Sequence, residues 1–532
     1  MQDYTITNAT VVDGTGNQPY TADVVIKDGR IERIMRFTDD SRAAHVIDAK
    51  GQVLAPGFID MHSHTDLQYL KEEPLDAKVR QGVTTELIGQ DGLGVAPIEP
   101  GTLPLLSGLT AGLLGKVPAG EWCWRSFGEY LDTLDRRRLP TNAAALASHG
   151  PIRIASMGMD NRPATAGELE RMRGMLGDMM ASGAYGLSTG LIYPPCSYCT
   201  TDELIALCRE VSPHDGIFVV HQRDEGYYLK RSFEEVTRIA REGGVHLHIS
   251  HLQAYGQVNW PLMDDVLAMA DRFIEEGHQV TWDRYPYLAG STVLTAVLPD
   301  WTLGAGTAAL VKNLRDRDFR ARVRAEYTKG LDQWHNRSIS VGWDKIVVSA
   351  VQRPENHWME GKDCAALARA TGKDPIDFVC DLLADEELAV TMISHYGSEE
   401  VLGKVLGHAQ ATVGSDGIYG GRPHPRLYGT YPRFLNQFVN VRRTMSLPEA
   451  IRKVTSVPAS ILGLRRRGQI REGWHADLVL FDPERITDTA TYEEPYQYPK
   501  GISYVFVNGK PVVADGEYNG ERPGRVLRRG VD

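Results

Sequence analysis

The sequence predicts an α/β protein: a TIM-like (β/α)8 barrel with a small β-sandwich domain built from both ends of the chain. Three observations support this fold class. The chain has 532 residues, more than one core usually organises, which favours one large and one smaller domain. β-rich runs alternate with helical patterns in the middle of the chain. Short strands joined by tight turns occupy the two ends.

The β domain is expected from two similar segments that lie far apart in the sequence. Near the N-terminus, an Asp-Gly turn separates two β-rich runs within Asp23–Ile34. Near the C-terminus, Ala476–Asp482 reads as a strand, and Tyr504–Lys510 runs into an Asn-Gly turn. Each end alone is too short to bury a core. The expected boundaries are 1–57 plus 466–532 for the β domain and 58–465 for the barrel, with insertions near 98–140 and 290–345.

A set of β-rich runs supplies the eight expected barrel strands. They are Val53–His62, Val83–Gly89, Ala143–His149, Gly183–Thr189, Ile217–His221, Val245–His251, Gln279–Tyr285 and Ala411–Asp416. Helical patterns between them include Ala166–Ala181, Thr201–Val211, Ser232–Glu242 and Leu262–Glu276. Two further runs, Lys345–Ala350 and Ala389–His395, also read as strands, so the choice of these eight is an assumption. In such a barrel, the active site lies at the carboxyl ends of the strands.

The composition indicates which kinds of partner and which cellular location to expect. The net charge of −11 argues against a nucleic-acid partner, because phosphate binding needs a basic surface. The sequence shows no basic leader and no apolar run that could span a bilayer, which predicts a cytoplasmic protein without a membrane partner. The six cysteines, including the Cys196-x-x-Cys199 pair, form no disulfide framework and are interpreted as reduced thiols. The sequence leaves open whether the chain forms a homo-oligomer.

Residues of the types that bind metals follow several of the expected strands. His62 and His64 form a His-x-His pair at the end of the first strand, where alternation puts both side chains on one face. This pair alone is a weak signal, since strand-end histidines are more often structural. Further residues of this kind end or follow other strands, namely Asp91, His221, His251 and Asp416. Neutral imidazole is the commonest ligand of divalent ions, so the set predicts a metal site at the barrel mouth.

The strand before His251 contains two more histidines, His246 and His248. Alternation places these two on one face of the strand and places Leu247, Ile249 and His251 on the other. An apolar face that ends in a polar residue suits a barrel interior, so we predict that His251 is the ligand. We expect His246 and His248 to pack against helices or to bind backbone groups.

Motifs along nearly the whole chain resemble one enzyme family. Ala55–His64 resembles the strand that opens the amidohydrolase superfamily of metal-dependent barrel enzymes. More narrowly, the chain is similar to the D-aminoacylase (N-acyl-D-amino-acid deacylase) family. The motifs that carry this resemblance are Gly82–Thr85, Gly158–Thr165, Gly186–Pro195, Ser250-His251, Tyr285–Tyr287, Gly414–Gly417, His424–Arg426 and Gly463–Val479.

The resemblance implies a zinc enzyme with one or two divalent ions and a catalytic carboxylate, Asp416. The implied metal ligands are His62 and His64 at one position and His221 and His251 at the neighbouring one. The implied substrate-contacting residues are Tyr193, Ser291 and Arg426. Arg426 suits a substrate carboxylate, although a structural ion pair explains it equally well. Tyr193 is either a hydrogen-bond donor or a pocket wall.

Two residues depart from the pattern of the resembling family. Asp91 stands where that family has a cysteine ligand, and aspartate is a harder ligand than thiolate. Gln253 stands where that family usually has a lysine, which weakens the case for carboxylate binding there. The fourth expected strand, Gly183–Thr189, has no lysine that could form a bridging carbamate. Asp91 is therefore the candidate that bridges two ions.

Together, the residues and the resemblance predict hydrolysis of an N-acyl-D-amino acid to a carboxylate and a free D-amino acid. The metal lowers the pKa of its bound water to about 7, which makes hydroxide available for attack. Asp416 takes the proton of that water and delivers it to the leaving amine. The alternative enzyme is a cyclic-amide hydrolase acting on hydantoin-like or dihydroorotate-like rings, and a metal-free scaffold protein is the alternative of another class. Selectivity for the D configuration follows from the resemblance alone.

Overall fold

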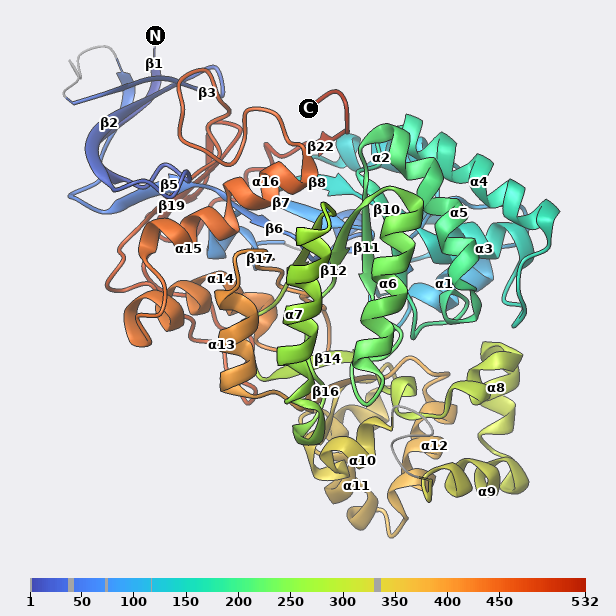
Figure 1. Cartoon of the computed structure of the whole chain (residues 1–532). Coiled ribbons are helices and arrows are strands. Elements are labelled where there is room, and N and C mark those ends of the chain that lie inside the picture. The colour runs from blue at the N-terminus through green and yellow to red at the C-terminus, as the bar shows by residue number, and fades with distance from the viewer. Residues whose placement is uncertain (1, 37–42, 72–74, 116, 330–335) are drawn as a thin grey trace.

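The computed structural model describes residues 2–36, 43–71, 75–115, 117–329 and 336–532 (Figure 1). Within these residues, parallel strands form a closed barrel. In barrel order they are β6 (Phe58–Asp60), β7 (Val83–Ile88), β8 and β9 (Asn142–Ala145 and Ala147–Ser148), β10 (Gly186–Gly190), β11 (Ile217–His221), β12 (His246–Ile249), β13 (Val280–Asp283) and β17 (Ala411–Thr412). Each run chosen from the sequence supplies one position in this barrel, so the predicted fold class is confirmed.

Two sheets make up the barrel wall. One has the order β17-β13-β12-β11-β10-β9, the other contains β8-β7-β6, and neighbours in both pair in parallel. The consecutive strands β8 and β9 join the sheets on one side. On the other side, Met61 N donates to Val413 O at 3.4 Å and Asp416 N donates to His62 O at 2.8 Å. This closure places His62 directly beside Asp416.

Helices cover the outside of the barrel (Figure 1). Those after β9, β10, β11 and β12 are α4 (Ala166–Ala181), α5 (Thr201–Val211), α6 (Leu229–Gly243) and α7 (Leu262–Glu275). Thr165 and Thr200 cap α4 and α5, because each side chain accepts a hydrogen bond from the backbone N–H three residues later. The remaining helices around the barrel are α1 (Leu103–Thr110), α2 (Phe127–Arg137), α3 (His149–Met157), α13 (Glu399–Gly407), α14 (Arg426–Leu435), α15 (Leu447–Val454) and α16 (Ser456–Leu462).

Both chain ends meet in one sheet, as predicted. Its order is β21-β20-β19-β18-β5-β1-β2-β3, with β4 paired to β1. The strands are β1 (Gln2–Val11), β2 (Tyr20–Lys27), β3 (Arg30–Met35), β4 (Ala43–Asp48), β5 (Val53–Pro56), β18 (Leu478–Phe481), β19 (Ile502–Val507), β20 (Lys510–Ala514) and β21 (Glu517–Tyr518). Residues from both ends, including Ile6, Val24, Leu478 and Phe506, are buried in one apolar cluster. Neither end could bury these side chains without the other.

The C-terminal tail leaves the β domain. β22 (Val526–Leu527) pairs in parallel with β8 of the barrel, and Arg529 N donates to Gly183 O at 3.0 Å. The expected assignment of 466–532 to the β domain therefore does not extend to this tail. We propose that the β domain ends ahead of Val526.

The chain between β13 and α13 forms a separate lobe at the bottom of Figure 1. Its antiparallel sheet has the order β14 (Ala289–Val293), β16 (Thr391–His395) and β15 (Ile346–Ala350). Its helices are α8 (Thr307–Asn313), α9 (Arg317–Glu326), α10 (Arg337–Val341), α11 (Cys364–Ala370) and α12 (Pro375–Asp385). The two additional β-rich runs therefore belong to this lobe, which extends beyond the predicted insertion at 290–345. Residues 116 and 330–335 of the predicted insertions lie outside the described residues.

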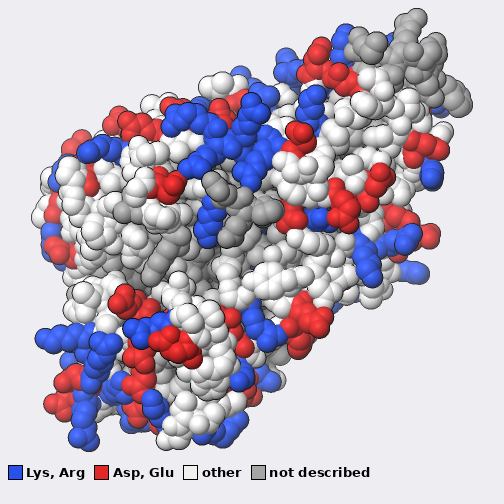
Figure 2. Space-filling model, turned by 180° about the vertical axis from the view of Figure 1, so that it is seen from behind, with Lys and Arg blue, Asp and Glu red and all other residues white. Residues whose placement is uncertain are grey.

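The surface carries charges of both signs. On the face shown in Figure 2, acidic and basic side chains are interspersed. Among the described residues, none of the helices combines the length and the apolar character that a membrane crossing requires.

Candidate active site

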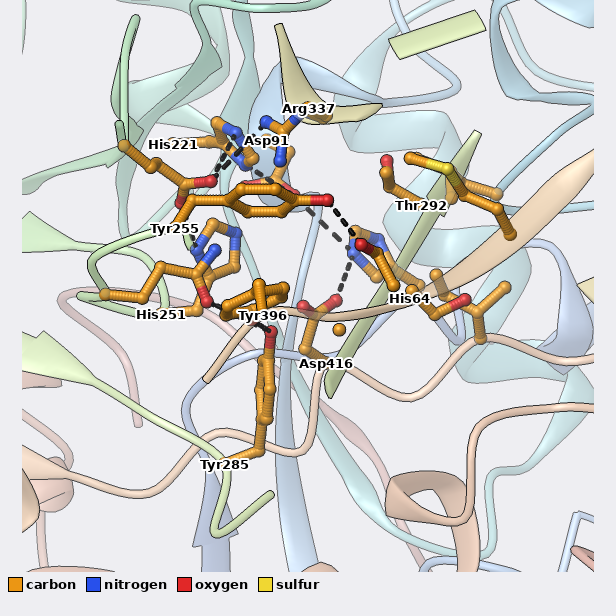
Figure 3. A pocket seen from close by; sticks show the side chains of 18 of the residues that line it. His64, Asp91, His221, His251, Tyr255, Tyr285, Thr292, Arg337, Tyr396 and Asp416 are labelled. Atoms are coloured by element: carbon orange, nitrogen blue, oxygen red, sulfur yellow. Dashed lines mark hydrogen bonds and ion pairs between the residues drawn. The ribbon is translucent and has the colours of Figure 1, made fainter. Parts of the chain in front are cut away.

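The predicted metal ligands lie together at the carboxyl ends of the barrel strands, and four of them, His64, Asp91, His221 and His251, are labelled in Figure 3. The ring centroids are 5.2 Å apart for His62 and His64 and 4.5 Å apart for His221 and His251. The ring of His62 also lies 5.3 Å from that of His251, which joins the two pairs. These four histidines and Asp91 are buried. The structure thus gathers in one place five residues that are widely separated in the sequence.

Asp91 lies between the two histidine pairs. Its Oδ2 is 3.5 Å from His62 Nε2, 3.7 Å from His64 Nε2 and 4.0 Å from His221 Nδ1. It belongs to one candidate ligand group with His62 and His64 and to another with His221 and His251. Burial would raise the pKa of Asp91, but the neighbouring histidines, above all His62, lower it to about 2. Asp91 is therefore an ionised oxygen donor close to both histidine pairs.

The donor set fits a divalent metal ion. His62 Nε2, His64 Nδ1 and both ring nitrogens of His221 are buried and have no hydrogen-bond partner in the part of the chain that the structure describes. Buried polar atoms without a partner are costly, and a metal would satisfy one nitrogen of each ring that binds it. Burial also lowers the pKa of His221 to about 4, which keeps its ring in the neutral form that binds metals. Imidazoles with a carboxylate are a usual zinc donor set.

Two carboxylates that the sequence did not single out hold the histidines in place. Asp283 Oδ2 lies 3.3 Å from His62 Nδ1, and its Oδ1 accepts a hydrogen bond from His251 N at 3.1 Å. Glu225 Oε1 lies 3.1 Å from His251 Nδ1, and its Oε2 lies 3.9 Å from His221 Nε2. Such outer carboxylates fix the orientation of a metal-binding ring. Asp283 lies within a predicted strand and Glu225 follows His221 by four residues, but neither position alone indicates a metal site.

His251 reaches the site by a different route from the one predicted. Leu247 and Ile249 share a buried cluster with residues of α6 and α7, so they face outward. His246 and His248 face the other way and hydrogen-bond to side chains of β13, so the prediction that they pack against helices or bind backbone was wrong. β12 ends at Ile249, and the left-handed backbone of His251 (φ 33°) turns its ring into the site. Strand alternation cannot foresee such a turn.

Asp416 faces the histidine cluster from the last barrel strand. Its Oδ1 lies 3.1 Å from His64 Nε2 and 3.6 Å from His62 Nε2. Its Oδ2 lies 3.0 Å from Arg426 Nη2. Burial would raise the pKa of Asp416, but the charges of Arg426 and His62 and the hydrogen bond with His64 hold it well below its usual range. A buried, ionised carboxylate beside the cluster can accept a proton and return it.

The predicted substrate-contacting residues occupy different positions. Tyr193 and Ser291 line the cavity beside the metal ligands, and Tyr193 OH is 2.7 Å from Thr292 Oγ1. Arg426 is fully buried behind Asp416 rather than on the cavity wall. Its Nη2 donates to Ser291 O at 3.0 Å, while its Nε and Nη1 lack partners among the described residues. The geometry thus gives Arg426 a contact with Asp416, and its contact with substrate stays a prediction.

Comparison with known proteins identifies the family. The model of the Amidohydrolase family matches residues 45–513. D-aminoacylase of Alcaligenes xylosoxydans xylosoxydans is 34% identical over 533 residues, which cover 99% of this chain and 98% of that protein. The chain belongs to the amidohydrolase family. The resemblance inferred from the sequence motifs is confirmed.

Two solved amidohydrolase structures are similar over the whole chain. N-acyl-D-glutamate deacylase from Bordetella bronchiseptica, complexed with zinc and a phosphonate that mimics the tetrahedral intermediate, has a TM-score of 0.84 and 32% identity and covers 99% of each chain. A structure of D-aminoacylase, described for the one-metal activation and second-metal attenuation of its binuclear centre, has a TM-score of 0.83 and 32% identity. The match covers 99% of this chain and 100% of that one.

Gln253, which stands where the related family has a lysine, lies in one wall of the cavity of this amidohydrolase. Gln253 Oε1 accepts hydrogen bonds from Arg284 Nη1 at 2.6 Å, from Tyr285 OH at 3.3 Å and from Tyr396 OH. A guanidinium therefore lies directly behind the neutral side chain. Arg337, from α10, lines the cavity as well. The wall thus keeps positive charge near the position where the related pattern has lysine.

Proposed function

We propose that this amidohydrolase is a zinc-dependent N-acyl-D-amino-acid deacylase. It hydrolyses the linear amide bond and releases a carboxylate and a free D-amino acid. The observation that carries this proposal is the convergence of two histidine pairs on Asp91, with Asp416 beside them. The relatives named D-aminoacylase and N-acyl-D-glutamate deacylase, both above 30% identity over the whole chain, support the linear amide and the D configuration.

Five residues of the chain would hold the zinc, as one or two ions: His62, His64, Asp91, His221 and His251. When bound, zinc supplies an activated water and polarises the amide carbonyl as a Lewis acid. Asp91 is an oxygen ligand, so it suits hard divalent ions better than a thiolate would. Asp283 and Glu225 support the proposal, because they orient the rings from outside the ligand set.

Asp416 moves the proton in this proposal. Its carboxylate accepts a proton from the attacking water and then gives it to the amide nitrogen, which departs readily only as a neutral amine. Arg426 holds Asp416 through the contact at 3.0 Å and keeps it ionised before the reaction. We assign substrate contacts to Tyr193 and Ser291, which line the cavity, and a substrate contact of Arg426 stays a prediction. The place of Ser291 on the cavity wall, with its carbonyl bound to Arg426, supports this assignment.

A panel of substrates tests the proposal on the full-length, zinc-loaded chain. The panel contains N-acetyl-D-amino acids, their L enantiomers, hydantoins and dihydroorotate. We expect release of free amine from the D series and far slower release from the L series. Ring opening without deacylation would replace the proposal by the cyclic-amide alternative. Absence of zinc binding and of any hydrolysis would replace it by the scaffold alternative.

A cytoplasmic location and self-association remain predictions from the sequence. Cell fractionation tests the first, and light scattering from the purified chain tests the second.

A further inference from the structure

The cavity beside the metal ligands is small, and a much larger apolar groove adjoins it. The cavity measures 30 Å³. The groove measures 860 Å³. Its walls come largely from α1, α8 and the segments around them, which face each other on the right of Figure 1. Apolar residues dominate these walls, among them Leu93, Leu109, Val293, Leu310 and Leu388.

The groove and the cavity adjoin each other. They share Leu113 and Tyr193 as lining residues. The Tyr193 ring lies 5.2 Å from the His221 ring, so the groove begins on the side of the metal ligands. The hydrogen bond between Tyr193 OH and Thr292 Oγ1 lies where the two spaces meet. Val293, the next residue of β14, lines the groove. Thr292 is labelled at the cavity wall in Figure 3.

The position of the groove relative to Asp416 indicates which part of the substrate the groove binds. The leaving nitrogen must lie beside Asp416, which gives it a proton. The α-carbon and its carboxylate are attached to that nitrogen, and the proposed binding mode places them on the side of Ser291, which lines the cavity. The acyl chain leaves the carbonyl carbon on the side away from the nitrogen, and the same binding mode directs it toward Tyr193. Only an apolar group suits the groove, because Glu387 is the one charged side chain among its described lining residues.

We propose that the groove binds the acyl chain of the substrate and that the enzyme prefers N-acyl-D-amino acids with extended apolar acyl groups. This inference rests on the proposed deacylase function. Burial of each methylene in an apolar site favours binding about three- to fourfold. Such binding is the same in the ground state and the transition state, so a longer chain lowers KM and leaves kcat nearly unchanged.

Two series of substrates test the proposal on the zinc-loaded wild-type chain. The first keeps one accepted D-amino acid and lengthens the acyl group from acetyl through butanoyl and hexanoyl to octanoyl. The second keeps the acetyl group and enlarges the D side chain. We expect kcat/KM to rise at least about tenfold from acetyl to hexanoyl, since four methylenes are added. A flat acyl series, or a preference confined to the side-chain series, overturns the proposal.

Gly108 of α1 offers a variant that fills the groove. It lines the groove, and a Cβ built there meets no atom within 4 Å, so Gly108→Phe begins in open space and adds bulk to the groove. Gly174 of α4 is also exposed with open space, and Gly174→Phe is the matched control. Leu105→Arg, at a side chain that is 40% exposed, places a charge in the same groove without disturbing the core.

We expect Gly108→Phe and Leu105→Arg to remove the advantage of hexanoyl over acetyl and to leave acetyl hydrolysis within about twofold of wild type. We expect Gly174→Phe to keep the advantage of hexanoyl over acetyl. Equal loss on both substrates, or retention of the hexanoyl preference in both groove variants, contradicts the proposal. The failures of the two proposals are distinct. A chain that hydrolyses no N-acyl-D-amino acid contradicts the deacylase function, whereas a deacylase indifferent to acyl length contradicts only the groove assignment.

Discussion

Arg426 Nη2 lies 3.0 Å from Asp416 Oδ2, and the two side chains are 0% and 7% exposed. A buried guanidinium in this position holds a carboxylate in one orientation through its planar geometry. The sequence left open whether Arg426 meets the substrate or forms a structural ion pair. The contact gives it a role through Asp416.

Substitution of Arg426 separates these roles. Lysine keeps the charge but not the planar geometry, so we expect Arg426→Lys to lower kcat by about tenfold or more with KM within about threefold. Steady-state kinetics of the zinc-loaded variant on N-acetyl-D-amino acids measure both constants. A raised KM with unchanged kcat would instead show that Arg426 mainly binds the substrate carboxylate.

Asp283 contacts His62 Nδ1 and is not one of the predicted metal ligands. We expect Asp283→Asn to weaken zinc affinity by about ten- to hundredfold, since outer carboxylates of this kind have effects of that size. Competition with a chromophoric chelator measures the affinity. Asp271→Asn is the control, because Asp271 pairs with His408 on the exposed side of α7. Equal zinc affinity in both variants would remove Asp283 from the supporting set.

We predict that Asp91 determines how many metal ions the site holds. Its Oδ2 is within 4.0 Å of nitrogens from both histidine pairs, so a neutral amide there loses the charge that two cations would share. We expect the wild-type chain to bind up to two zinc ions and Asp91→Asn to bind one at most. Elemental analysis after equilibration with zinc gives the ratio. An unchanged ratio in Asp91→Asn would show that Asp91 is not a bridging ligand.

A second buried cluster gives a pH dependence of stability. His149 Nε2 lies 2.9 Å from Glu203 Oε1. Burial lowers the pKa of His149, but Cys196 and Glu203 raise it to about 9. The folded pKa therefore exceeds the unfolded value of about 6.5. His149 thus contributes stability that is fully present below about pH 6.5 and is lost as the pH rises through about 9.

Urea unfolding at several pH values tests this contribution. We expect the free energy of unfolding to fall by on the order of 3 kcal/mol across the window in the wild-type chain. His149→Gln flattens this dependence, whereas His214→Gln, at an exposed position, leaves it unchanged. The same slope in both variants would exclude His149 as its source.

Much of the site was predictable because its residues lie where β-rich runs end. Barrel strands bring their carboxyl ends to one mouth, so His62, His64, His221 and Asp416 could be placed together before any coordinates. The two-residue period of a strand defined which runs are strands. It did not define which sheet each run joins, and Ile346–Ala350 pairs in the separate lobe.

The remaining features depend on contacts between distant residues. The ring of His251 enters the site through a left-handed backbone that follows the end of β12, where strand alternation no longer applies. Asp283 and Glu225 became visible as supporting groups only through their distances to the histidines. The burial of Arg426 depends on how α14 packs against the barrel, which no local pattern of residues encodes.

The central claim is that the histidine cluster and Asp91 hold zinc while Asp416 moves the proton. Asp416→Asn tests it most directly, because the amide is nearly isosteric and cannot act as a base. The measurement is kcat on an N-acyl-D-amino acid together with zinc content, in wild type and variant. We expect a loss of about a thousandfold in kcat with zinc content unchanged. Retention of kcat within tenfold in the zinc-loaded variant would contradict it.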